Sequence, residues 1–568
     1  MNCAEFLIDF LSHRGVKYVF TLPGSHIYPL WMALDHSSCI TPIVTCHELS
    51  AGYMADGYAR SSRTLAVVMT IGGPGSNNLI TAVNTARIER VPLLIITGDV
   101  PIQLYDKMAF QCSTYLGTND DALYQVAAKW SRRVSNADQF PDLLHEAVSS
   151  ALSYPQGPSH LIIPYDIQQT PLSSKILSNS EERHLSFNQS ELFNGTFETT
   201  LQRVQNLLSS KVNIALWVGE TMNTPDLASR IEMIARKAHI PVLTTFSAKG
   251  VISESHPLCF GNFGYAGSPQ ATHLLRDTRL DALIGLDVVQ NERNTLGWNP
   301  VIYSRKECIF LSSDRESDCA LQKHSYCLDL SKFLEKLVNS LVIPDELRKM
   351  REAWVFELQQ TTSAHSLPKR NGRGEIQSET LEIDAIVRTL RDTVPKNSIL
   401  VVDSGTHRVF AGACWRSYAP STFFSASMVA PMGWGIAAGI GVKLARAEPV
   451  VVFTGDGCLL MHGTEIKTAV KYRVPLLFVV SNNHGLGNVH IRLKKNGVRK
   501  LDTTEIRELD VVGFAKSMGA AAYRVTSLSD FQSRVTQALG TNQVTVLDVP
   551  TSITPRIPEG VPFFSIYA

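Results

Sequence analysis

Short runs of β-branched residues alternate with amphipathic stretches along most of the chain, and this alternation restricts the fold more than any other feature of the sequence. In the first third it predicts strands at residues 16–20, 40–45, 65–70 and 93–97, separated by helices at 27–35, 48–60 and 76–88. Further strands are expected at 213–218, 242–245, 282–286, 398–402, 450–454, 476–481 and 544–549. Strand–helix alternation of this kind is typical of parallel sheets with helices on both faces. The sequence therefore predicts an α/β protein built from doubly wound parallel sheets.

Two polar, turn-rich stretches divide the chain into three parts. Residues 172–190 and 361–380 are rich in Ser, Gly and charged residues, as expected of linkers. A chain of 568 residues is also too long for a single hydrophobic core. We therefore expect three α/β domains, at residues 1–170, 197–344 and 378–568.

The charge balance excludes some classes of partner. Lys and Arg number 53 and Asp and Glu 52, so the net charge of +1 does not favour binding to nucleic acid or to a membrane surface. The first 13 residues contain two acidic residues and do not resemble a secretory leader, and the longest apolar runs are strand-sized. Ten cysteines occur without a CxxC pair, which fits a reducing compartment. We expect a cytoplasmic protein that acts on small molecules.

Carboxylate and amide side chains follow two neighbouring strands in the last third of the chain. Asp456, flanked by Gly455 and Gly457, follows strand 450–454, and Asn483 follows strand 476–481, with a helix expected at 462–472. One βαβ unit places both side chains at the carboxyl edge of the sheet. Their oxygens are ligands that Mg²⁺ accepts, and the glycines allow a diphosphate to approach the backbone. Each motif alone is more often a surface turn, but the pair predicts a metal–diphosphate site.

This segment, GDGCLLMHGTEIKTAVKYRVPLLFVVSNN, resembles the metal-binding motif of thiamine-diphosphate-dependent enzymes. The resemblance implies that Asp456, Asn483 and the carbonyl of Gly485 bind Mg²⁺. It implies that the amides of Gly457 and Cys458 hold the diphosphate of the cofactor.

The same resemblance extends to other turns of the third domain. It implies a cofactor-binding role for Ser404, Thr406, His407, Ala430, Met432, Leu486 and Gly487. Met432 would lie beneath the cofactor, and the carbonyl of Ala430 would accept from its aminopyrimidine. A dinucleotide site is the alternative, because residues 433–438 fit GxGxxA with Asp456 downstream. That reading leaves Asn482 and Asn483 unexplained.

An acidic residue opens a helix in the first domain. His47-Glu48 precedes the stretch LSAGYMADGYAR, and a carboxylate at a helix start is by itself ordinary. The combination resembles the second fingerprint of the thiamine family, in which the glutamate hydrogen-bonds the aminopyrimidine ring and promotes cofactor activation. Glu48 is thereby the expected catalytic acid.

Three further segments of the first domain resemble the family. The glycine-rich turn at 70–78 supplies Gly73 and Asn78 to the cofactor. Phe110-Gln111 matches the FQ pair of acetohydroxyacid synthases, in which the glutamine faces the reaction centre. Residues 164–168, with Tyr165, resemble the segment that closes this domain. In this family the first domain of one subunit faces the third domain of another, so we expect a homodimer or homotetramer.

The resemblance is strongest to acetohydroxyacid (acetolactate) synthases and implies decarboxylation of a 2-oxo acid such as pyruvate, followed by transfer of the two-carbon unit to an acceptor carbonyl. Three positions depart from the synthases, which have tryptophan, lysine and glycine where this chain has Arg492, Tyr165 and Ser25. Arg492 suits an anionic acceptor group, or is a solvated surface residue. His26 has a counterpart in benzaldehyde lyase-like enzymes, or is an ordinary loop histidine.

Several alternatives stay open at this point. A benzaldehyde lyase-like or hydroxyacyl lyase reaction would proceed without 2-oxo acid decarboxylation, and a simple 2-oxo acid decarboxylase would lack the acceptor. Residues 264–267 and 287–293 match the FAD-holding segments of the synthases only loosely, so FAD is not favoured. A flavin or nicotinamide oxidoreductase and a catalytically silent scaffold are the remaining classes, and the presence of Glu48, Asp456 and Asn483 argues against the scaffold.

Overall fold

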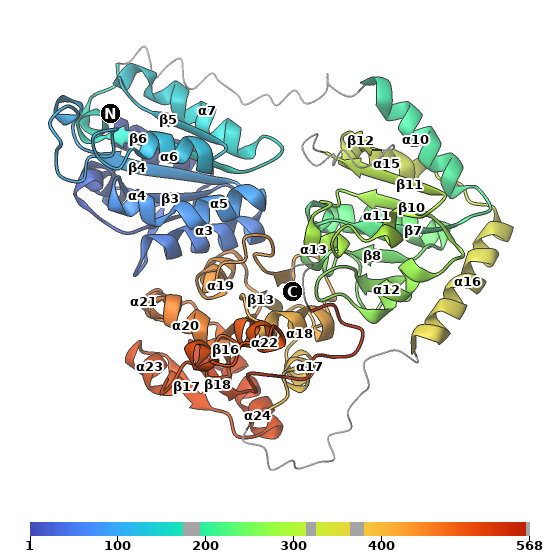
Figure 1. The fold of residues 1–568 in the computed structure, drawn as a ribbon. Helices are drawn as coiled ribbons and strands as arrows, with labels where there is room; N and C mark the ends of the chain where they lie inside the picture. The colour runs from blue at the N-terminus through green and yellow to red at the C-terminus, as the bar shows by residue number, and fades with distance from the viewer. Residues whose placement is uncertain (174–193, 314–324, 364–379, 564–568) are drawn as a thin grey trace.

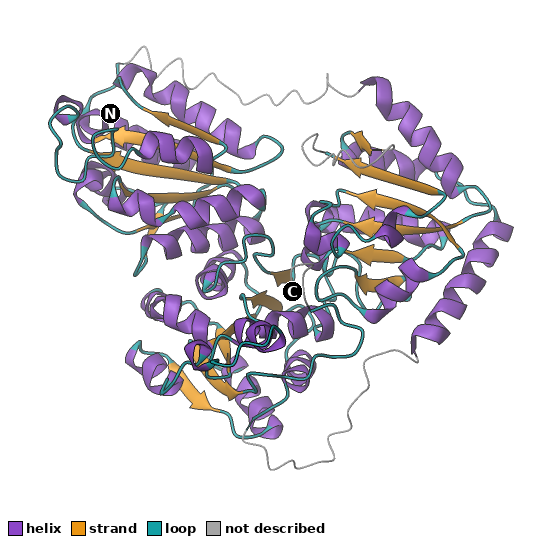
Figure 2. Ribbon diagram, viewed as in Figure 1, coloured by secondary structure: helices purple, strands orange, loops and turns teal. Residues whose placement is uncertain are grey.

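The computed structural model describes residues 1–173, 194–313, 325–363 and 380–563, and these form three six-stranded sheets (Figure 1). Every strand pair within the three sheets is parallel. Helices cover both faces of each sheet (Figure 2). The predicted α/β fold with three doubly wound domains is confirmed.

The first domain has the strand order β2-β1-β3-β4-β6-β5. Its strands are β1 Tyr18–Thr21, β2 Thr41–Val44, β3 Ala66–Ile71, β4 Leu93–Asp99, β5 Trp130–Arg133 and β6 Pro158–Pro164. Its helices are α1 Cys3–His13, α2 Tyr28–Asp35, α3 Glu48–Ser62, α4 Pro74–Asn78, α5 Ile80–Ile88, α6 Asp120–Ala127, α7 Phe140–Leu152 and α8 Tyr165–Gln169.

The central domain has the order β12-β11-β10-β7-β8-β9. Its strands are β7 Asn213–Val218, β8 Val242–Thr244, β9 Cys259–Asn262, β10 Leu280–Leu286, β11 Glu307–Ser312 and β12 Ser325–Cys327. Its helices are α10 Asn194–Leu208, α11 Pro225–Ala238, α12 Pro269–Arg276, α13 Glu292–Thr295, α14 Pro300–Tyr303, α15 Leu330–Ser340 and α16 Asp345–Ser363.

The third domain has the order β14-β13-β15-β16-β18-β17. Its strands are β13 Ile399–Val402, β14 Phe423–Phe424, β15 Val450–Gly455, β16 Leu477–Asn482, β17 Ala521–Arg524 and β18 Thr545–Pro550. Its helices are α17 Ile383–Thr393, α18 Thr406–Cys414, α19 Trp434–Ala445, α20 Asp456–His462, α21 Ile466–Lys471, α22 Gly487–Lys495, α23 Val511–Ser517 and α24 Leu528–Leu539.

The strands expected from the sequence are present, with ends within two residues of the expected positions. Two helices differ. The segment expected at 76–88 is divided into α4 and α5, and the segment expected at 462–472 begins at Asp456 as α20 and continues as α21. Gly455 is the N-cap of α20, so the strand passes into the helix without an intervening loop. Helix α16 begins at Asp345, just beyond the expected end of the central domain, and its last residues lie in the second expected linker. Most of both expected linkers lies outside the described residues.

The first and third domains are joined by a close crossing of two helices, α3 and α19 (Figure 1). A Cβ atom on Gly57 of α3 would lie 2.2 Å from the carbonyl oxygen of Ala438. A Cβ on Gly441 of α19 would lie 1.9 Å from the carbonyl oxygen of Met54. At the same crossing the indole of Trp434 donates to the buried carboxylate of Asp56 at 3.2 Å. The two backbones touch directly, so only glycine fits at these positions.

Replacing Gly441 by alanine should destabilise the protein by about 1–3 kcal/mol, because the new methyl group meets backbone atoms that cannot rotate away. An alanine in a helix interior otherwise stabilises relative to glycine by roughly 0.5–1 kcal/mol, so the sign of the effect is informative. Gly540→Ala is the matched control, since the nearest atom to its Cβ lies 3.6 Å away. Thermal melting of both variants measures the difference, and an unchanged melting temperature for Gly441→Ala would contradict the described crossing.

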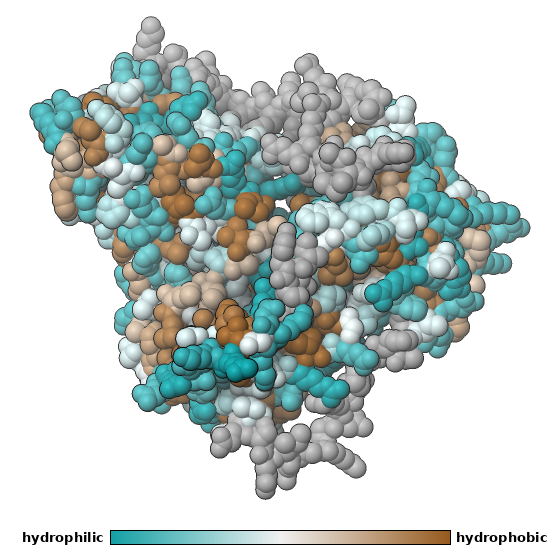
Figure 3. Space-filling model, in the orientation of Figure 1, coloured by the Kyte–Doolittle hydropathy of each residue, from teal (hydrophilic) through white to brown (hydrophobic). Residues whose placement is uncertain are grey.

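No helix among the described residues is both long and apolar enough to cross a membrane. Figure 3 shows hydrophilic and apolar residues interspersed over the visible face.

Candidate active site

Three neighbouring strands of the third domain, β13, β15 and β16, end at the same edge of its sheet. Ser404 follows β13, Asp456 follows β15, and Asn483 follows β16. This arrangement was predicted from the sequence for Asp456 and Asn483. In the structure both side chains accept from the same backbone amide, that of Gly485.

The carboxylate of Asp456 is almost fully buried, with 2% of the residue exposed. One oxygen accepts from the amide of Gly457 and the other from the amide of Gly485, each at 2.9 Å. The side-chain oxygen of Asn483 accepts from the same Gly485 amide at 3.0 Å. Burial raises the pKa of Asp456 to about 6, and the two amides partly offset that rise. A buried carboxylate beside an amide oxygen is a donor set that fits a hard divalent cation such as Mg²⁺.

Polar groups without partners surround this donor set. A Cβ on Gly487 would lie 2.7 Å from the side-chain nitrogen of Asn483 and 2.8 Å from the hydroxyl of Thr406, so glycine is needed where these two side chains approach the backbone. The hydroxyl of Thr406 and Nε2 of His407 are buried without a hydrogen-bond partner in the structure. Burial lowers the pKa of His407 to about 3, so its ring is neutral. These groups fit a diphosphate, which accepts from hydroxyl, imidazole and amide donors.

The turn before α19 lies beside this edge. Ala430 has a left-handed backbone with φ of 54°, and its carbonyl accepts from the hydroxyl of Ser404 at 2.7 Å. The methyl end of Met432 would lie 2.9 Å from a Cβ on Gly457, so Met432 packs over the turn that carries Asp456. Cys458, the next expected ligand, is buried and donates its thiol to the carbonyl of Ser404 at 3.0 Å.

Asp403 is a site residue that the sequence reasoning missed. It is 1% exposed and accepts from the amides of Ser404 at 2.8 Å and Gly433 at 2.9 Å, and from the hydroxyl of Thr454 at 3.0 Å. It thereby ties the end of β13 to the turn that carries Met432. The signal was available, because Asp403 follows a buried strand just as Asp456 does.

Glu48 is the first residue of α3, and His47 caps the helix by accepting from the amide of Leu49. One oxygen of Glu48 accepts from the side-chain amide of Asn78 at 3.0 Å. The other would lie 3.5 Å from a Cβ on Gly75, in the glycine-rich turn. The structure therefore brings together the expected catalytic acid and the turn that was predicted to line the cofactor.

Gly73 and Gln111 also meet at this turn. Gly73 has φ of 67°, and its Cβ would lie 3.0 Å from the carbonyl oxygen of Gln111. Gln111 itself has φ of 57°. Its neighbour Phe110 is 82% exposed, so the aromatic ring lies outside the core of the first domain.

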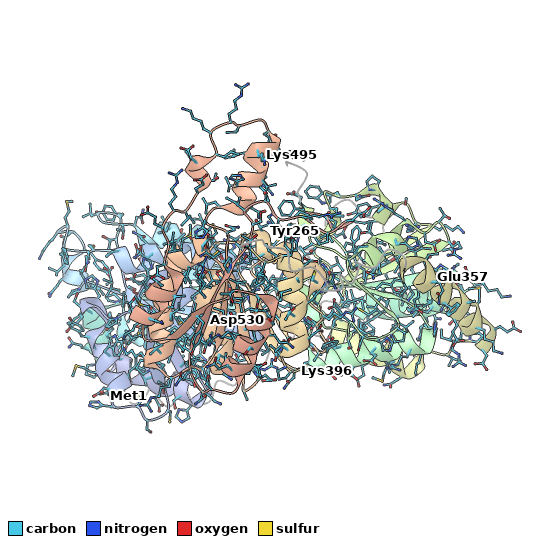
Figure 4. All side chains as sticks on the ribbon, turned by 90° about the horizontal axis from the view of Figure 1, so that it is seen from below. Met1, Tyr265, Glu357, Lys396, Lys495 and Asp530 are labelled. Atoms are coloured by element: carbon cyan, nitrogen blue, oxygen red, sulfur yellow. The ribbon has the colours of Figure 1, made fainter. Side chains whose placement is uncertain are left out.

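The other expected substrate residues lie at different depths. Ser25 is exposed, whereas His26 is buried, with Nδ1 unpaired and its pKa lowered by burial. The carbonyl of His26 would meet a Cβ on Gly98 at 2.1 Å, which places this turn at the carboxyl end of β4. Tyr165 is half-buried at the start of α8. Arg492 is half-buried in α22, the helix that stands out from the body and ends at Lys495 (Figure 4).

Helix α3 contacts α20, the helix that begins at Asp456, through His462. Its Nδ1 and the hydroxyl of Ser50 share a hydrogen bond of 2.9 Å, and its ring would lie 2.3 Å from a Cβ on Gly433. Glu465, just beyond, accepts from the amide of Cys46 at 3.0 Å. Within one chain, the helix of Glu48 and the turn of Met432 therefore rest on the same imidazole.

Burial, together with the nearby His47, lowers the pKa of His462 to about 4. Below pH of about 6.5 the unfolded chain takes up a proton here that the folded protein does not, so stability falls towards pH 4 and then levels off. His462→Gln keeps the Ser50 contact and should remove up to about 3 kcal/mol of this loss. Urea midpoints at pH 7 and 4.5 measure it, with the exposed His36→Gln as control. Equal pH sensitivity in wild type and His462→Gln would contradict the assignment.

The alternative dinucleotide motif is used in packing. A Cβ on Gly435 would lie 2.8 Å from the Cβ of Asp403, and one on Gly439 would lie 2.2 Å from a methyl group of Val452. No strand ends directly before α19. In the central domain, Arg293 lies over the ring of Tyr265 at 4.5 Å, and its carbonyl accepts from the Tyr265 amide at 2.8 Å. These residues bind one another, and they lend no support to FAD.

Comparison with known families gives three matches, one in each domain. Residues 1–117 match the model described as thiamine pyrophosphate enzyme, N-terminal TPP binding domain. Residues 201–337 match the central domain of the same enzymes, and residues 403–549 match their C-terminal TPP binding domain.

Relatives of full length carry the same family assignment. The probable acetolactate synthase large subunit of Methanococcus aeolicus is 26% identical over 100% of this chain and 95% of its own. The acetolactate synthase isozyme 1 large subunit of Escherichia coli K12 is 28% identical over 86% and 82%. The chloroplastic acetolactate synthase 1 of Nicotiana tabacum is 26% identical over 99% and 84%.

Proposed function

Because the chain belongs to the thiamine pyrophosphate enzyme family and is acetolactate synthase-like, we propose that it decarboxylates a 2-oxo acid such as pyruvate and transfers the two-carbon unit to an acceptor carbonyl. The class, a thiamine-diphosphate-dependent enzyme that forms carbon–carbon bonds, was predicted from the sequence and is confirmed. The observation that carries the finer proposal is the grouping of Glu48, Asn78 and Gln111 around one glycine-rich turn.

The third domain would hold the cofactor and its metal. Asp456, Asn483 and the carbonyl of Gly485 would bind Mg²⁺, and the amides of Gly457 and Cys458 would meet the diphosphate. Thr406 and His407 offer the buried donors that have no partner in the structure. When bound, thiamine diphosphate supplies a nucleophilic carbon and stabilises the negative charge left when CO₂ departs.

The first domain would supply the proton chemistry. The carboxyl group of Glu48 would hold a proton at the aminopyrimidine, with its orientation fixed by the amide of Asn78 at 3.0 Å. Gln111, whose backbone packs on Gly73, would orient the carbonyl of the substrate or the acceptor. Phe110, Ser25, His26, Tyr165 and Arg492 stay predictions for the substrate side.

We propose that two or more copies assemble to complete the site. Large apolar side chains are exposed on the loop that contains Gln111, at Met108, Phe110 and Tyr115, and on α2 of the same domain, at Tyr28 and Met32. Large exposed apolar side chains of this kind support an interface with another copy.

The first experiment is calorimetric titration of metal-stripped protein with thiamine diphosphate, with and without Mg²⁺. Binding that requires Mg²⁺ supports the cofactor assignment, and a screen of 2-oxo acids for CO₂ release, with and without acceptor aldehydes and 2-oxo acids, then tests the reaction. Ligated product supports the proposal. CO₂ release with an aldehyde as sole product points to a simple decarboxylase, and cleavage of an acyloin without CO₂ points to a lyase.

A further inference from the structure

The connection that carries Phe110 and Gln111 is long. Residues 100–119 run from the end of β4 to the start of α6 and contain only one short 3₁₀ helix, Ile102–Leu104. Met108 and Tyr115 are 74% and 75% exposed, whereas Cys112 and Ser113 are 3% and 0% exposed. Cys112 and Ser113 are therefore fixed in the core, while side chains on both sides of them face outward and the neighbouring Gln111 is half-buried. Chain of this length needs anchors to hold one conformation.

One guanidinium group supplies several of these anchors. Arg133 is the last residue of the edge strand β5, with 14% of its side chain exposed. Nη1 donates to the carboxylate of Asp99 at the end of β4. It also donates to the hydroxyl of Tyr105, at 2.9 Å. Nη2 donates to the carbonyl of Ser113 at 3.1 Å and to its hydroxyl at 3.0 Å. Nε and Nη2 both donate to Asp121 of α6, at 2.9 and 2.7 Å.

These contacts reach the site through Ser113. Its amide donates to Asp99 at 3.0 Å, and its carbonyl also accepts from the amide of Asp120 at 2.9 Å. The carboxylate of Asp120 accepts from the amide of Gly73 at 3.1 Å. Gly73 is the residue on which the Gln111 carbonyl packs. Arg133 therefore lies under both ends of the segment 105–113 and is linked to the turn beside Glu48.

We propose that Arg133 is a positioning residue that fixes Gln111 over the glycine-rich turn and so acts on the ligation reaction through Gln111. The role of Gln111 in this inference rests on the proposed function, whereas the contacts of Arg133 with the loop are independent of it. Arginine suits the task because its planar fork binds several acceptors in fixed directions, which a lysine cannot do. Displacement of a reacting group by about 1 Å can cost roughly 10²-fold in rate.

A double-mutant cycle between Arg133→Ala and Gln111→Ala tests the proposal on the complete enzyme with Mg²⁺ and thiamine diphosphate. Arg133→Ala should lower kcat by about 10- to 100-fold, with a smaller change in KM for the 2-oxo acid. In the Gln111→Ala background the same substitution should change kcat by less than about threefold, because the group it positions is absent. Equal losses in both backgrounds would show a general structural effect and overturn the proposal.

Arg132→Ala is the matched control, since Arg132 is adjacent on β5 and exposed, and its guanidinium donates to the carbonyl of its neighbour Ser131 rather than to the loop. It should leave kcat unchanged. Arg133→Lys keeps the positive charge beside Asp99 if removal of the charge prevents folding, and it should still lower kcat because the fork is lost. Guanidinium added to Arg133→Gly at millimolar concentration should restore part of the rate. Full activity in Arg133→Lys would overturn the proposal.

Hydrogen exchange separates failure of this inference from failure of the proposed function. Amides of residues 105–113 should exchange faster in Arg133→Ala than in wild type, and should be unchanged in Arg132→Ala. This readout needs no turnover, so it tests the anchoring even if no 2-oxo acid is consumed. Unchanged exchange in Arg133→Ala would remove the positioning role whatever the activity.

Discussion

Glu48→Gln should lower kcat by roughly 10²–10⁴-fold while the protein still binds thiamine diphosphate in a Mg²⁺-dependent manner. Glutamine has the shape of glutamate and can still accept from Asn78, so the local structure and the start of α3 are retained. It cannot donate and recover a proton as a carboxyl group does. The measurement is steady-state CO₂ release together with calorimetric titration of the cofactor.

A matched control separates this chemistry from the helix dipole. Glu346 is an exposed acidic residue in the first turn of α16, so Glu346→Gln removes the same charge from a comparable helix position. It should leave kcat unchanged. Near-normal turnover in Glu48→Gln would contradict the proposed proton chemistry, and loss of cofactor binding there would assign Glu48 to binding instead.

Asp456→Ala should weaken Mg²⁺-dependent cofactor binding by at least about 10²-fold, because the variant lacks the only charged ligand of the proposed metal site. Wild-type protein should gain about 2.7 kcal/mol of stability at a cofactor concentration one hundred times its Kd, and the variant should gain almost none. Thermal melting with and without Mg²⁺ and thiamine diphosphate measures both proteins.

The metal-free proteins provide a second comparison. The carboxylate of Asp456 is buried and its pKa is raised to about 6, so at pH 7 its charge is costly without a cation. Asp456→Asn removes that charge but leaves one of the two amides without an acceptor, whereas Asp456→Ala leaves both. In the absence of metal, Asp456→Asn should therefore be closer in stability to wild type than Asp456→Ala. Asp502→Ala, an exposed acidic residue in the same domain, is the control. Cofactor affinity unchanged in Asp456→Ala would rule out the proposed metal site.

Most of the fold could be predicted from the alternation of apolar strands and amphipathic helices in the sequence. Strand 213–218 was located to the residue because six buried or half-buried residues follow a clear turn. Two interior strands, β6 and β11, were not predicted although they contain apolar runs. The edge strand β2 was predicted, but five other edge strands, β5, β9, β12, β14 and β17, were not; β5 reads Trp-Ser-Arg-Arg, and β14 has only two residues. A strand that is buried on one side or paired on one side needs no continuous apolar run, so its sequence resembles a loop.

Residues of the site were predictable where strand and motif coincide, as at Asp456 and Asn483. Residues that support the site without lining it were not predictable. Nothing in the sequence near Arg133 indicates which carboxylates and carbonyls it contacts across the sheet. The same holds for His462, whose contact with Ser50, 412 residues away in the chain, joins the third domain to the first. Such contacts depend on how elements far apart in the chain pack against one another, which the pattern of residues along the chain does not reveal.

The crossing of α3 and α19 has a consequence for the independence of the domains. A single apolar core contains Phe20, Tyr53 and Val68 from the first domain together with Val401 and Val452 from the third. A second core is drawn entirely from the central domain. The first and third domains thus share one apolar core across this crossing, although the whole central domain lies between them in the chain. Excising either would expose a shared apolar face to water. The central domain is tied in less extensively: besides its own core, it places Phe246, Tyr265 and Ala266 in a core of the third domain.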